Sequence, residues 1–481
     1  MQIIHYKQNI FITKICNYMK SQLCMAALLI LLTGCHSKQQ QANSSEQSEI
    51  TDQKTAVVYM TQDISPASLV RIYEALGRPA EGRVAVKIST GEAGGHNYLK
   101  PELISQLVHQ VNGTIVECNT AYPGKRNSTK EHWQTIRDHG FLDIAKVDLM
   151  DEEGDFTIPV QDSTWIHYDR VGTHLKNYDF MINLAHFKGH AMGGFGGVLK
   201  NQSIGVASAA GKAYIHSAGI TESTIKTWLH TDNQDGFLES MAAAAQAVHN
   251  YFGNGERILY INVVNNLSVD CDCDSHPAAP EMDDIGILAS LDPVALDQAC
   301  VDLVFNYPSK DGDNAAALIE RINSRHGIHT IEHAAKIGLG SRQYELVSID
   351  GADMLSLLNT NNLSLLVRNK GVTTTHDNRG VQDLLALLAE QPDRLHGAVV
   401  ADKMIGKAAA ALMISGGVKA VYTNLICTPA REMLQQAGVK VVAAEEVPMI
   451  LNRDRSGQCP IDSRLNDAQT VEECVAILRQ L

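Results

Sequence analysis

Short apolar runs alternate with amphipathic stretches over most of the chain. Runs rich in β-branched residues predict buried strands at 84–88, 114–117, 180–184 and 258–264. Apolar residues at helical spacing predict helices at 101–111, 129–138, 238–250 and 293–305. Strands that alternate with helices in this way are typical of an α/β fold with a largely parallel sheet.

A polar break at 359–363 interrupts this pattern, which then starts again. Later strands are expected at 363–368, 398–402, 420–424 and 439–444. The helices between them are expected at 381–388, 407–414 and 429–437. The sequence therefore predicts one α/β domain over residues 55–357 and a second, of ordinary domain size, over residues 363–481.

The N-terminal region carries a pattern typical of a secreted lipoprotein. Residues 25–32 are apolar but too few to span a bilayer as a helix. The sequence Leu-Thr-Gly-Cys that ends at Cys35 is typical of the site where bacterial lipoproteins are cleaved and acylated, and Lys14 and Lys20 supply the upstream positive charge. We predict a signal peptide over 1–34, a lipid on Cys35 and a flexible tether over 35–54. An ordinary hydrophobic N-terminus is the alternative.

This prediction sets the expected location and one partner. The mature protein would lie in the cell envelope, anchored to a membrane by the lipid at Cys35 and facing the periplasm or the exterior. Its formal net charge is −14 over 481 residues, and no basic stripe stands out, so nucleic acid is not an expected partner. Seven of the ten cysteines follow Cys35; their odd number and wide scatter do not indicate a disulfide framework, although an oxidising compartment permits single bridges.

The stretch 183–201 combines polar groups with glycines directly after a predicted strand. His186, Lys188 and His190 alternate there, and Lys200 and Asn201 follow two glycine pairs. A strand that runs into a glycine-rich turn is where open α/β sheets bind ligands. We predict that His190 and Lys188 carry catalysis, that Lys200 and Asn201 bind a ligand, and that His186 is structural.

A second polar turn follows the strand predicted at 114–117. It contains Asn119 and Arg126. Because the guanidinium fork matches carboxylates and phosphates, both residues are predicted to bind an anionic substrate. An ordinary surface turn is the alternative.

The segment 270–274 reads Asp-Cys-Asp-Cys-Asp. If the strand at 258–264 continues this far, Cys271 and Cys273 share one face, with His276 just beyond. Two thiolates and an imidazole form a soft ligand set, so we predict a metal ion or an iron–sulfur centre held by Cys271, Cys273, His276 and His190. A disulfide between the two cysteines and a loop with two idle thiols are the alternatives.

Two aspartates accompany the helix predicted at 293–305. Asp292 precedes Pro293 and is expected to cap the helix, whereas Asp297 would face either the site or solvent. Residues 205–212 look like a phosphate loop, but Ala213 stands where a Mg²⁺-binding hydroxyl is needed, so ATP hydrolysis is not expected.

Four segments together resemble one known family, called domain of unknown function 362 (DUF362) and often titled uncharacterised iron–sulfur centre protein: 119–126, 188–205, 270–274 and 284–299. The resemblance covers roughly residues 55–307. Many members carry a ferredoxin insert after the segment that corresponds to 211–217. Residues 218–235 stand there in this chain without a cysteine, so the inserted cluster is absent and the family core remains.

The second domain resembles domain of unknown function 1893 (DUF1893), a relative of the cytidine deaminase fold, at 402–410 and 452–460. The zinc ligands and the glutamate of active deaminases are missing at 407–409 and 427–431, so zinc deamination is not expected. The resemblance implies a mixed or parallel sheet in the DUF362-type domain. For the smaller domain it implies a three-layer α/β/α fold.

These expectations combine into one hypothesis of function. The chain would be a lipid-anchored protein that binds a metal or redox centre, with a degenerate deaminase-like module at its C-terminal end. Two alternatives remain. One is a lipoprotein that only binds a small anion, and the other is a metal-assisted isomerase or racemase of a small acid that uses His190 as a base.

Overall fold

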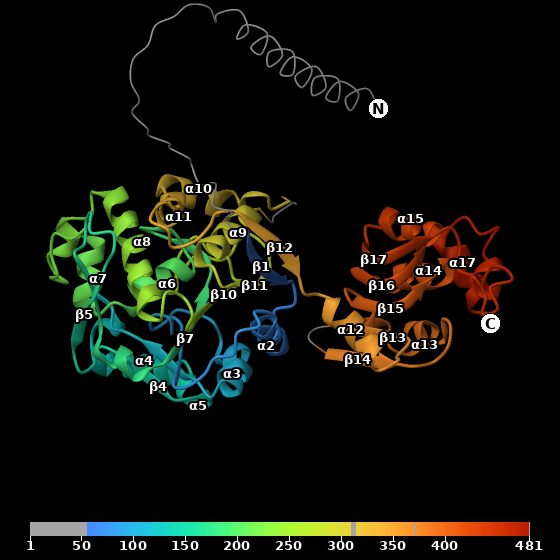
Figure 1. Cartoon of the computed structure of the whole chain (residues 1–481), viewed down its shortest axis with the longest axis horizontal. Helices are drawn as coiled ribbons and strands as arrows, with labels where there is room; N and C mark the ends of the chain where they lie inside the picture. Colours follow the sequence, from blue (N-terminus) through green and yellow to red (C-terminus); the bar gives the residue numbers. More distant parts are fainter. Residues whose placement is uncertain (1–54, 309–313, 370–371, 481) are drawn as a thin grey trace, which may run out of the picture. The chain divides into compact units, whose positions relative to one another are not determined.

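The computed structural model describes residues 55–308, 314–369 and 372–480 (Figure 1). The predicted signal peptide, Cys35 and the tether lie outside the described residues. Within the described part of the chain, every helix is too short or too polar to cross a bilayer.

An eight-stranded sheet organises the larger domain, in the order β12-β1-β11-β10-β7-β2-β3-β4. Strand β11 is antiparallel to both neighbours, and the other strands pair in parallel. The strands are β1 (Ala56–Thr61), β2 (Val84–Lys87), β3 (Thr114–Glu117), β4 (Val147–Leu149), β7 (Phe180–His186), β10 (Ile258–Val264), β11 (Gly286–Ser290) and β12 (Tyr344–Ser348). The expected α/β class with a mixed sheet is confirmed.

Helices cover both faces of this sheet, because its strands are buried on both sides. Val84 and Val86 pack on one face with the first helices of the chain, whereas Ala85 between them joins the core on the other face. The first face carries α2 (Pro66–Ala75), α3 (Pro101–Gln110), α4 (Thr129–Asp138) and α5 (Phe141–Ile144). The second carries α6 (Val198–Val206), α8 (Gln234–Tyr251), α9 (Pro293–Phe305), α10 (Ala316–Ser324) and α11 (Ile328–Lys336).

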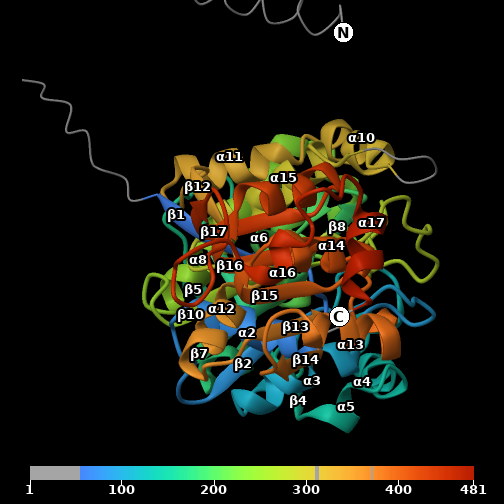
Figure 2. The same ribbon diagram turned by 90° about the vertical axis from the view of Figure 1, so that its right-hand side faces the viewer.

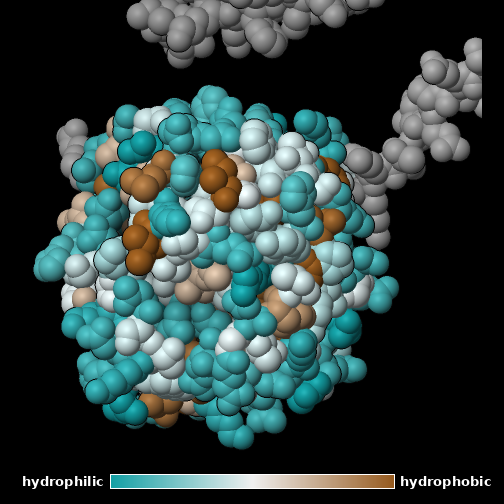
Figure 3. Space-filling view, turned by 90° about the vertical axis from the view of Figure 1, so that its left-hand side faces the viewer, coloured by the Kyte–Doolittle hydropathy of each residue, from teal (hydrophilic) through white to brown (hydrophobic). Residues whose placement is uncertain are grey.

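Smaller elements complete this domain. Two antiparallel hairpins form from β5 (Asp155–Pro159) with β6 (Tyr168–Gly172) and from β8 (Lys188–His190) with β9 (Gly194–Gly196). Helix α7 (Ala209–His216) and the 3₁₀ turns η1 (Lys125–Asn127), η2 (Thr173–Asn177) and η3 (Thr227–Leu229) lie between the main elements. The face of this domain in Figure 3 is mainly hydrophilic, and its apolar side chains are separated by polar ones.

A five-stranded sheet organises the second domain, in the order β14-β13-β15-β16-β17 (Figure 2). Its strands are β13 (Leu365–Asn369), β14 (Val372–His376), β15 (Val399–Ile405), β16 (Ala420–Cys427) and β17 (Lys440–Val447). Its helices are α12 (Ala352–Thr360), α13 (Gln382–Glu390), η4 (Pro392–Arg394), α14 (Lys407–Ser415), α15 (Thr428–Gln436), α16 (Pro460–Ser463) and α17 (Val471–Leu478). Helix α12 packs on one face and α13, α14, α15 and α17 pack on the other, which gives three layers.

One conditional expectation does not hold. Strand β10 ends at Val264, and the cysteine pair lies in a loop rather than on a continued strand. The chain turns at Asn266, whose φ is +46°, and returns so that Ile285 N donates to the carbonyl of Val264. Asparagine tolerates this left-handed conformation better than β-branched residues do, so it ends the strand.

Candidate functional site

Three parallel strands of the larger sheet end at one cavity. Lys87, Glu117 and His186 are the last residues of β2, β3 and β7, and all three line a cavity of about 290 Å³. Because these strands are parallel neighbours, their carboxyl ends meet at the edge where α/β sheets bind ligands. The hairpin β8–β9, the first turn of α6, helix α7 and the cysteine loop supply most of the remaining wall.

The wall of the cavity is rich in cations although the whole chain is acidic. Its basic side chains outnumber its two carboxylates, Glu117 and Asp272. The basic residues are Lys87, Arg126, Lys188, Lys200 and Lys212. Cations that are held in a partly buried concave site raise the local concentration of anions, so the cavity favours an anionic ligand.

Lys188 forms a buried cluster with His186 and Asp272. Lys188 Nζ makes an ion pair with Asp272, and His186 Nδ1 lies 3.0 Å from Asp272 Oδ1 and 3.0 Å from Lys188 Nζ. Burial raises the pKa of the Asp272 carboxyl, but Lys188 and then His186 outweigh this effect and hold that pKa well below its usual range. Asp272 therefore compensates the charge of Lys188 and fixes its position at the wall.

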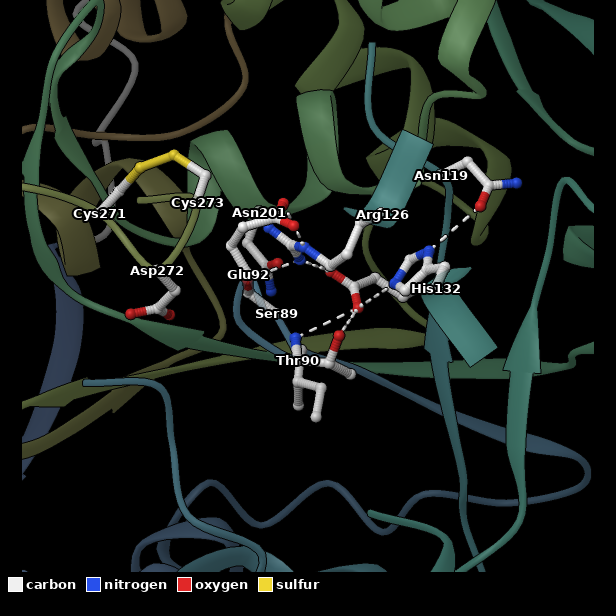
Figure 4. Close-up of polar contacts among 12 residues, drawn as sticks. Ser89, Thr90, Glu92, Asn119, Arg126, His132, Asn201, Cys271, Asp272 and Cys273 are labelled. Carbon is white, nitrogen blue, oxygen red and sulfur yellow. Dashed lines mark hydrogen bonds and ion pairs between the residues drawn. A yellow bond between two sulfur atoms is a disulfide. The ribbon is translucent and has the colours of Figure 1, made fainter. Parts of the chain in front are cut away.

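Arg126 is held by acidic groups of the chain itself (Figure 4). Its Nη1 donates to Glu117 at 2.7 Å and its Nη2 donates to the hydroxyl of Tyr122 at 2.8 Å, while Glu92 lies at 3.5 Å from Nε. His132 lies 3.2 Å from the other oxygen of Glu117. The guanidinium lines the cavity, but these partners already compensate its charge.

Asn119 lies outside the lining of the cavity. Its Nδ2 donates to Thr129 Oγ1 at 3.0 Å, and its Oδ1 lies 3.1 Å from His132 Nδ1. The side chain therefore supports His132 and, through it, the carboxylate of Glu117.

Lys200 is the least compensated cation of the wall. Among the described residues its Nζ has no hydrogen-bond acceptor, in contrast to Lys87, which donates to Asn201 Oδ1 at 3.2 Å. Burial and the charge of Lys188 lower the pKa of Lys200 to about 7, and burial lowers the pKa of Lys87 to about 8. Asn201 also donates to Asn183 at 2.7 Å, so it anchors Lys87 rather than pointing freely into the cavity.

The tautomer of His190 is set by the tip of its hairpin. His190 Nδ1 accepts the backbone N–H groups of Met192 at 3.2 Å and Gly193 at 2.8 Å. The ring proton of the neutral imidazole therefore lies on Nε2. Burial, and then the charge of Lys200, lower the pKa of His190 well below its usual value, so the ring is a neutral N–H donor.

Cys271 and Cys273 form a disulfide at the wall of the cavity (Figure 4). One ligand atom from each of Cys271, Cys273 and His190 lies within 4.8 Å of the others, so the structure brings together three of the predicted metal ligands. The fourth, His276, is exposed and contacts Ser275 instead.

The arrangement of His190 does not fit a metal ligand. A metal-binding histidine usually donates its second ring N–H to an acceptor. Here the second nitrogen, Nδ1, faces two N–H donors, so a metal on Nε2 would require a doubly deprotonated ring. The two sulfurs would also have to be reduced before they could act as thiolate ligands.

The N-terminus of α6 is occupied by a carboxylate of the chain. Asp297 on α9 accepts the backbone N–H groups of Val198 at 2.9 Å and Leu199 at 3.0 Å, and the side chain of Asn262 at 2.8 Å. Burial raises the pKa of Asp297 to about 6. Asp292 caps α9 as expected, since it accepts from Val294 and Ala295.

Four residues that line the cavity were not predicted as site residues from the sequence: Lys87, Glu117, Lys212 and His216. Lys87 and Glu117 are charged residues within otherwise apolar strands, which is a signal that could have identified them. Lys212, on α7, was considered only as part of a failed phosphate loop. Its Nζ donates to the carbonyl of Ala207 at 2.6 Å.

The larger domain is an α/β domain with a cavity at the carboxyl ends of its parallel strands, and a second α/β domain follows it in the chain. Comparison with family models identifies both. The model described as Domain of unknown function (DUF362) matches residues 84–302, and the model described as Domain of unknown function (DUF1893) matches residues 353–481. The chain carries a DUF362 domain and a DUF1893 domain in that order.

Three solved structures are similar to parts of the chain. A DUF1893 family protein from Thermotoga maritima is 26% identical, and the match covers 27% of this chain and 86% of that one, with a TM-score of 0.25. The lactate racemase apoprotein from Thermoanaerobacterium thermosaccharolyticum is 15% identical over 52% of this chain and 57% of that one (TM-score 0.31). Another Thermotoga maritima protein is 11% identical over 50% and 59% (TM-score 0.32). No curated protein matches the chain.

Proposed function

We propose that the DUF362 domain binds a small anion, of carboxylate or phosphate character, next to a redox-active pair formed by Cys271 and Cys273. The observation that carries this proposal is Lys200, a cavity lysine whose Nζ has no acceptor among the described residues, in a wall where cations exceed carboxylates. A bound anion would supply the missing acceptor. Charge-assisted hydrogen bonds of this kind are among the stronger ones.

Each group has a defined part in this proposal. Lys200 and Lys87 bind the anion, and His190 donates its Nε2 proton to an oxygen of the ligand. Lys188 is kept in place by Asp272 and adds positive charge beside the sulfurs. Reduction of the disulfide takes two electrons and two protons and yields two thiols. An external thiol reductant can supply these electrons and protons by thiol–disulfide exchange and is itself oxidised to a disulfide.

Anion binding is tested by thermal unfolding and by calorimetric titration with sulfate. Lys200→Met should weaken sulfate binding by about ten- to a hundred-fold, because it removes one charged hydrogen bond of about 1.5–3 kcal/mol. Lys130→Met is the matched control, since it removes the same charge from an exposed position on α4. Equal affinities of the two variants would overturn the anion site.

The redox part is tested separately, by titrating the thiols in glutathione buffers with and without sulfate. The cationic wall favours the thiolate of the reduced pair, and a bound anion offsets that charge. Sulfate should therefore make the disulfide harder to reduce in the wild type, but not in Lys200→Met. If the midpoint potential of the disulfide does not change with sulfate, the cavity would bind anions without coupling to the cysteines. That outcome would favour the first alternative inferred from the sequence, a lipoprotein that only binds a small anion.

A metal centre is the second candidate, because the sulfurs and the imidazole lie within 4.8 Å, but it requires a reduced cysteine pair and loss of the two backbone hydrogen bonds at His190 Nδ1. It requires stoichiometric metal in anaerobically purified, reduced protein, and loss of that metal in Cys271→Ser and Cys273→Ser. The isomerase alternative requires hydrogen exchange into a small acid that stops in His190→Ala. His190 is poorly suited to act as this base, because Nε2 carries the ring proton and Nδ1 already accepts two backbone N–H groups.

We also propose that the protein is anchored to a membrane by a lipid on Cys35, on the periplasmic or outer side of the cell envelope. The proposal is supported by the sequence around Cys35 and by the disulfide, since disulfides persist in oxidising compartments. Labelled palmitate should be incorporated into the wild type and not into Cys35→Ala. Incorporation that does not depend on Cys35 would overturn the anchor.

A further inference from the structure

A second group of histidine and carboxylate side chains lies on the helical layer, with no residue in common with the cavity wall. Helices α8 and α11 pack against each other and bring together Glu239 from α8 and His329 and His333 from α11. The two histidines are four residues apart, so they lie on the same face of α11. One ligand atom from each of the three residues lies within 4.8 Å of the other two.

Three polar heads face one another within this group. His329 Nε2 lies 3.0 Å from Glu239 Oε1, and His333 Nδ1 lies 3.4 Å from the same oxygen. His333 and Glu239 also bond other residues through the atoms that point away from this group. Asp162 Oδ2 lies 2.6 Å from His333 Nε2, and Trp165 Nε1 donates to Glu239 Oε2 at 2.7 Å.

The inner nitrogen of His333 is an unpartnered buried polar atom. The side chain is 4% exposed, and Nδ1 makes no hydrogen bond. Because Nε2 is bonded to Asp162, Nδ1 is the ring nitrogen left to face Glu239, and no hydrogen bond bridges the 3.4 Å between Nδ1 and Oε1. A buried polar atom without a hydrogen bond beside a carboxylate is an arrangement that a bound cation would satisfy.

We propose that Glu239 Oε1, His329 Nε2 and His333 Nδ1 bind a divalent transition metal of the Zn²⁺ class. Two imidazoles and one carboxylate are a ligand set that zinc uses with a fourth, open position. Asp162 orients His333 in the way that a carboxylate orients the ring of a zinc-bound histidine, and Trp165 orients Glu239. His329 and Glu239 are partly exposed, which leaves a path for the ion.

The metal would join two helices and a loop. Asp162 and Trp165 both lie between β5 and β6, so an ion on His333 and Glu239 links α11 and α8 to the β5–β6 connection. An ion that binds only the folded arrangement stabilises the fold in proportion to its affinity. Zinc should therefore raise the thermal unfolding temperature.

The test is a zinc titration of tag-free full-length protein, with its disulfide oxidised, after removal of metals by a chelator. Competition with a chromophoric chelator should show one bound Zn²⁺ per chain. His333→Gln and His329→Gln should each weaken binding at least about a hundred-fold, since each removes a ligand. His326→Gln is the matched control: His326 is exposed and close in sequence, but it pairs with Asp235.

Glu239→Gln is a second variant that keeps the shape of the side chain and an oxygen for Trp165, so it separates loss of the ligand charge from loss of folding. Circular dichroism without metal should be the same for all variants. Co²⁺ should give weak visible bands without the intense charge-transfer band of a thiolate ligand. Absence of zinc binding, equal binding by the histidine variants, or loss of the ion in Cys271→Ser instead would each overturn the proposal.

Discussion

At the scale of single residues, the charge of Lys200 decides how the cavity responds to pH. Burial and the charge of Lys188 lower the pKa of Lys200 to about 7. Above this pH the amine is mostly neutral, and it must take up a proton before it can form a charged hydrogen bond with an anion. The affinity for sulfate, whose charge is constant near neutrality, should therefore fall as the pH rises through about 7. The step near pH 7 should disappear in Lys200→Met and leave only the titration of Lys87 near pH 8, as measured by calorimetry at a series of pH values.

The same group affects folding with the opposite sign. The unfolded chain keeps the lysine proton up to its ordinary pKa of 10.5, whereas the folded protein releases it near 7. Without ligand, the contribution of Lys200 to the free energy of unfolding therefore rises with pH between these two values. A sulfate affinity that stays constant across pH 7 would contradict the lowered pKa of Lys200.

His190 gives a second prediction at this scale. Because Nδ1 accepts two backbone N–H groups and burial lowers the pKa of the ring, His190 should remain the neutral Nε2–H tautomer from mildly acidic to mildly alkaline pH. The ¹⁵N chemical shifts of the imidazole measure this directly. A proton on Nδ1 would contradict it and would make Nε2 available to a metal.

Some single-residue roles followed from the sequence and others could not. The cap at Asp292 was predictable, because a cap depends on neighbours two or three residues away. The role of Asp297 was not, since its partners Val198 and Leu199 lie about a hundred positions earlier in the chain. The compensation of Arg126 by Glu117 and Glu92 is likewise a tertiary effect that spacing does not show.

At the scale of elements, burial explains which strands were foreseen. The strands at 114–117 and 258–264 are fully or largely buried apolar runs, and the sequence gives their bounds without error. Strands β8 and β9, of three residues each, carry no period that distinguishes them from a loop. The two cysteines were expected to share a strand face only if β10 continued, but the chain turns at Asn266 before it reaches them.

The candidate site was partly predictable for the same reason. Lys188, His190 and Lys200 follow β7 in the sequence and the two cysteines follow β10, and parallel strand ends meet at one edge of the sheet. The contribution of α7 could not be inferred, because it depends on how the helices pack.

The β8–β9 hairpin should be sensitive to substitution at Gly194. Its φ is +78°, and a Cβ there would lie 2.9 Å from the Cα of Gly327. Gly194→Ala should lower the free energy of unfolding by about 2–4 kcal/mol, as measured by urea denaturation, since strain and overlap add. Gly338→Ala is the control: its φ is +81°, but nothing lies within 4 Å of the added Cβ.

Gly338→Ala should cost only the strain of its backbone conformation, about 1 kcal/mol. Equal losses at Gly194 and Gly338 would show that the contact with Gly327 has no effect on stability.

At the scale of the whole molecule, the cysteines can be counted. The described chain contains five free cysteines and one disulfide. Protein that begins at Thr55 should therefore react at five thiols when unfolded without reductant and at seven after reduction. A thiol-reactive chromophore in denaturant measures both numbers, and seven thiols without reductant would remove the redox pair from the proposal.

The position of Asp297 has a consequence for the kind of selectivity this protein can have. The amide groups that open α6 would otherwise form a directional cradle for an anion, but they are already bonded within the chain. Discrimination between ligands then depends on the ammonium groups, which act as point charges and make little demand on the shape of the ligand. The protein should accept compounds of equal charge and different outline with similar strength, and rising ionic strength should release them all alike.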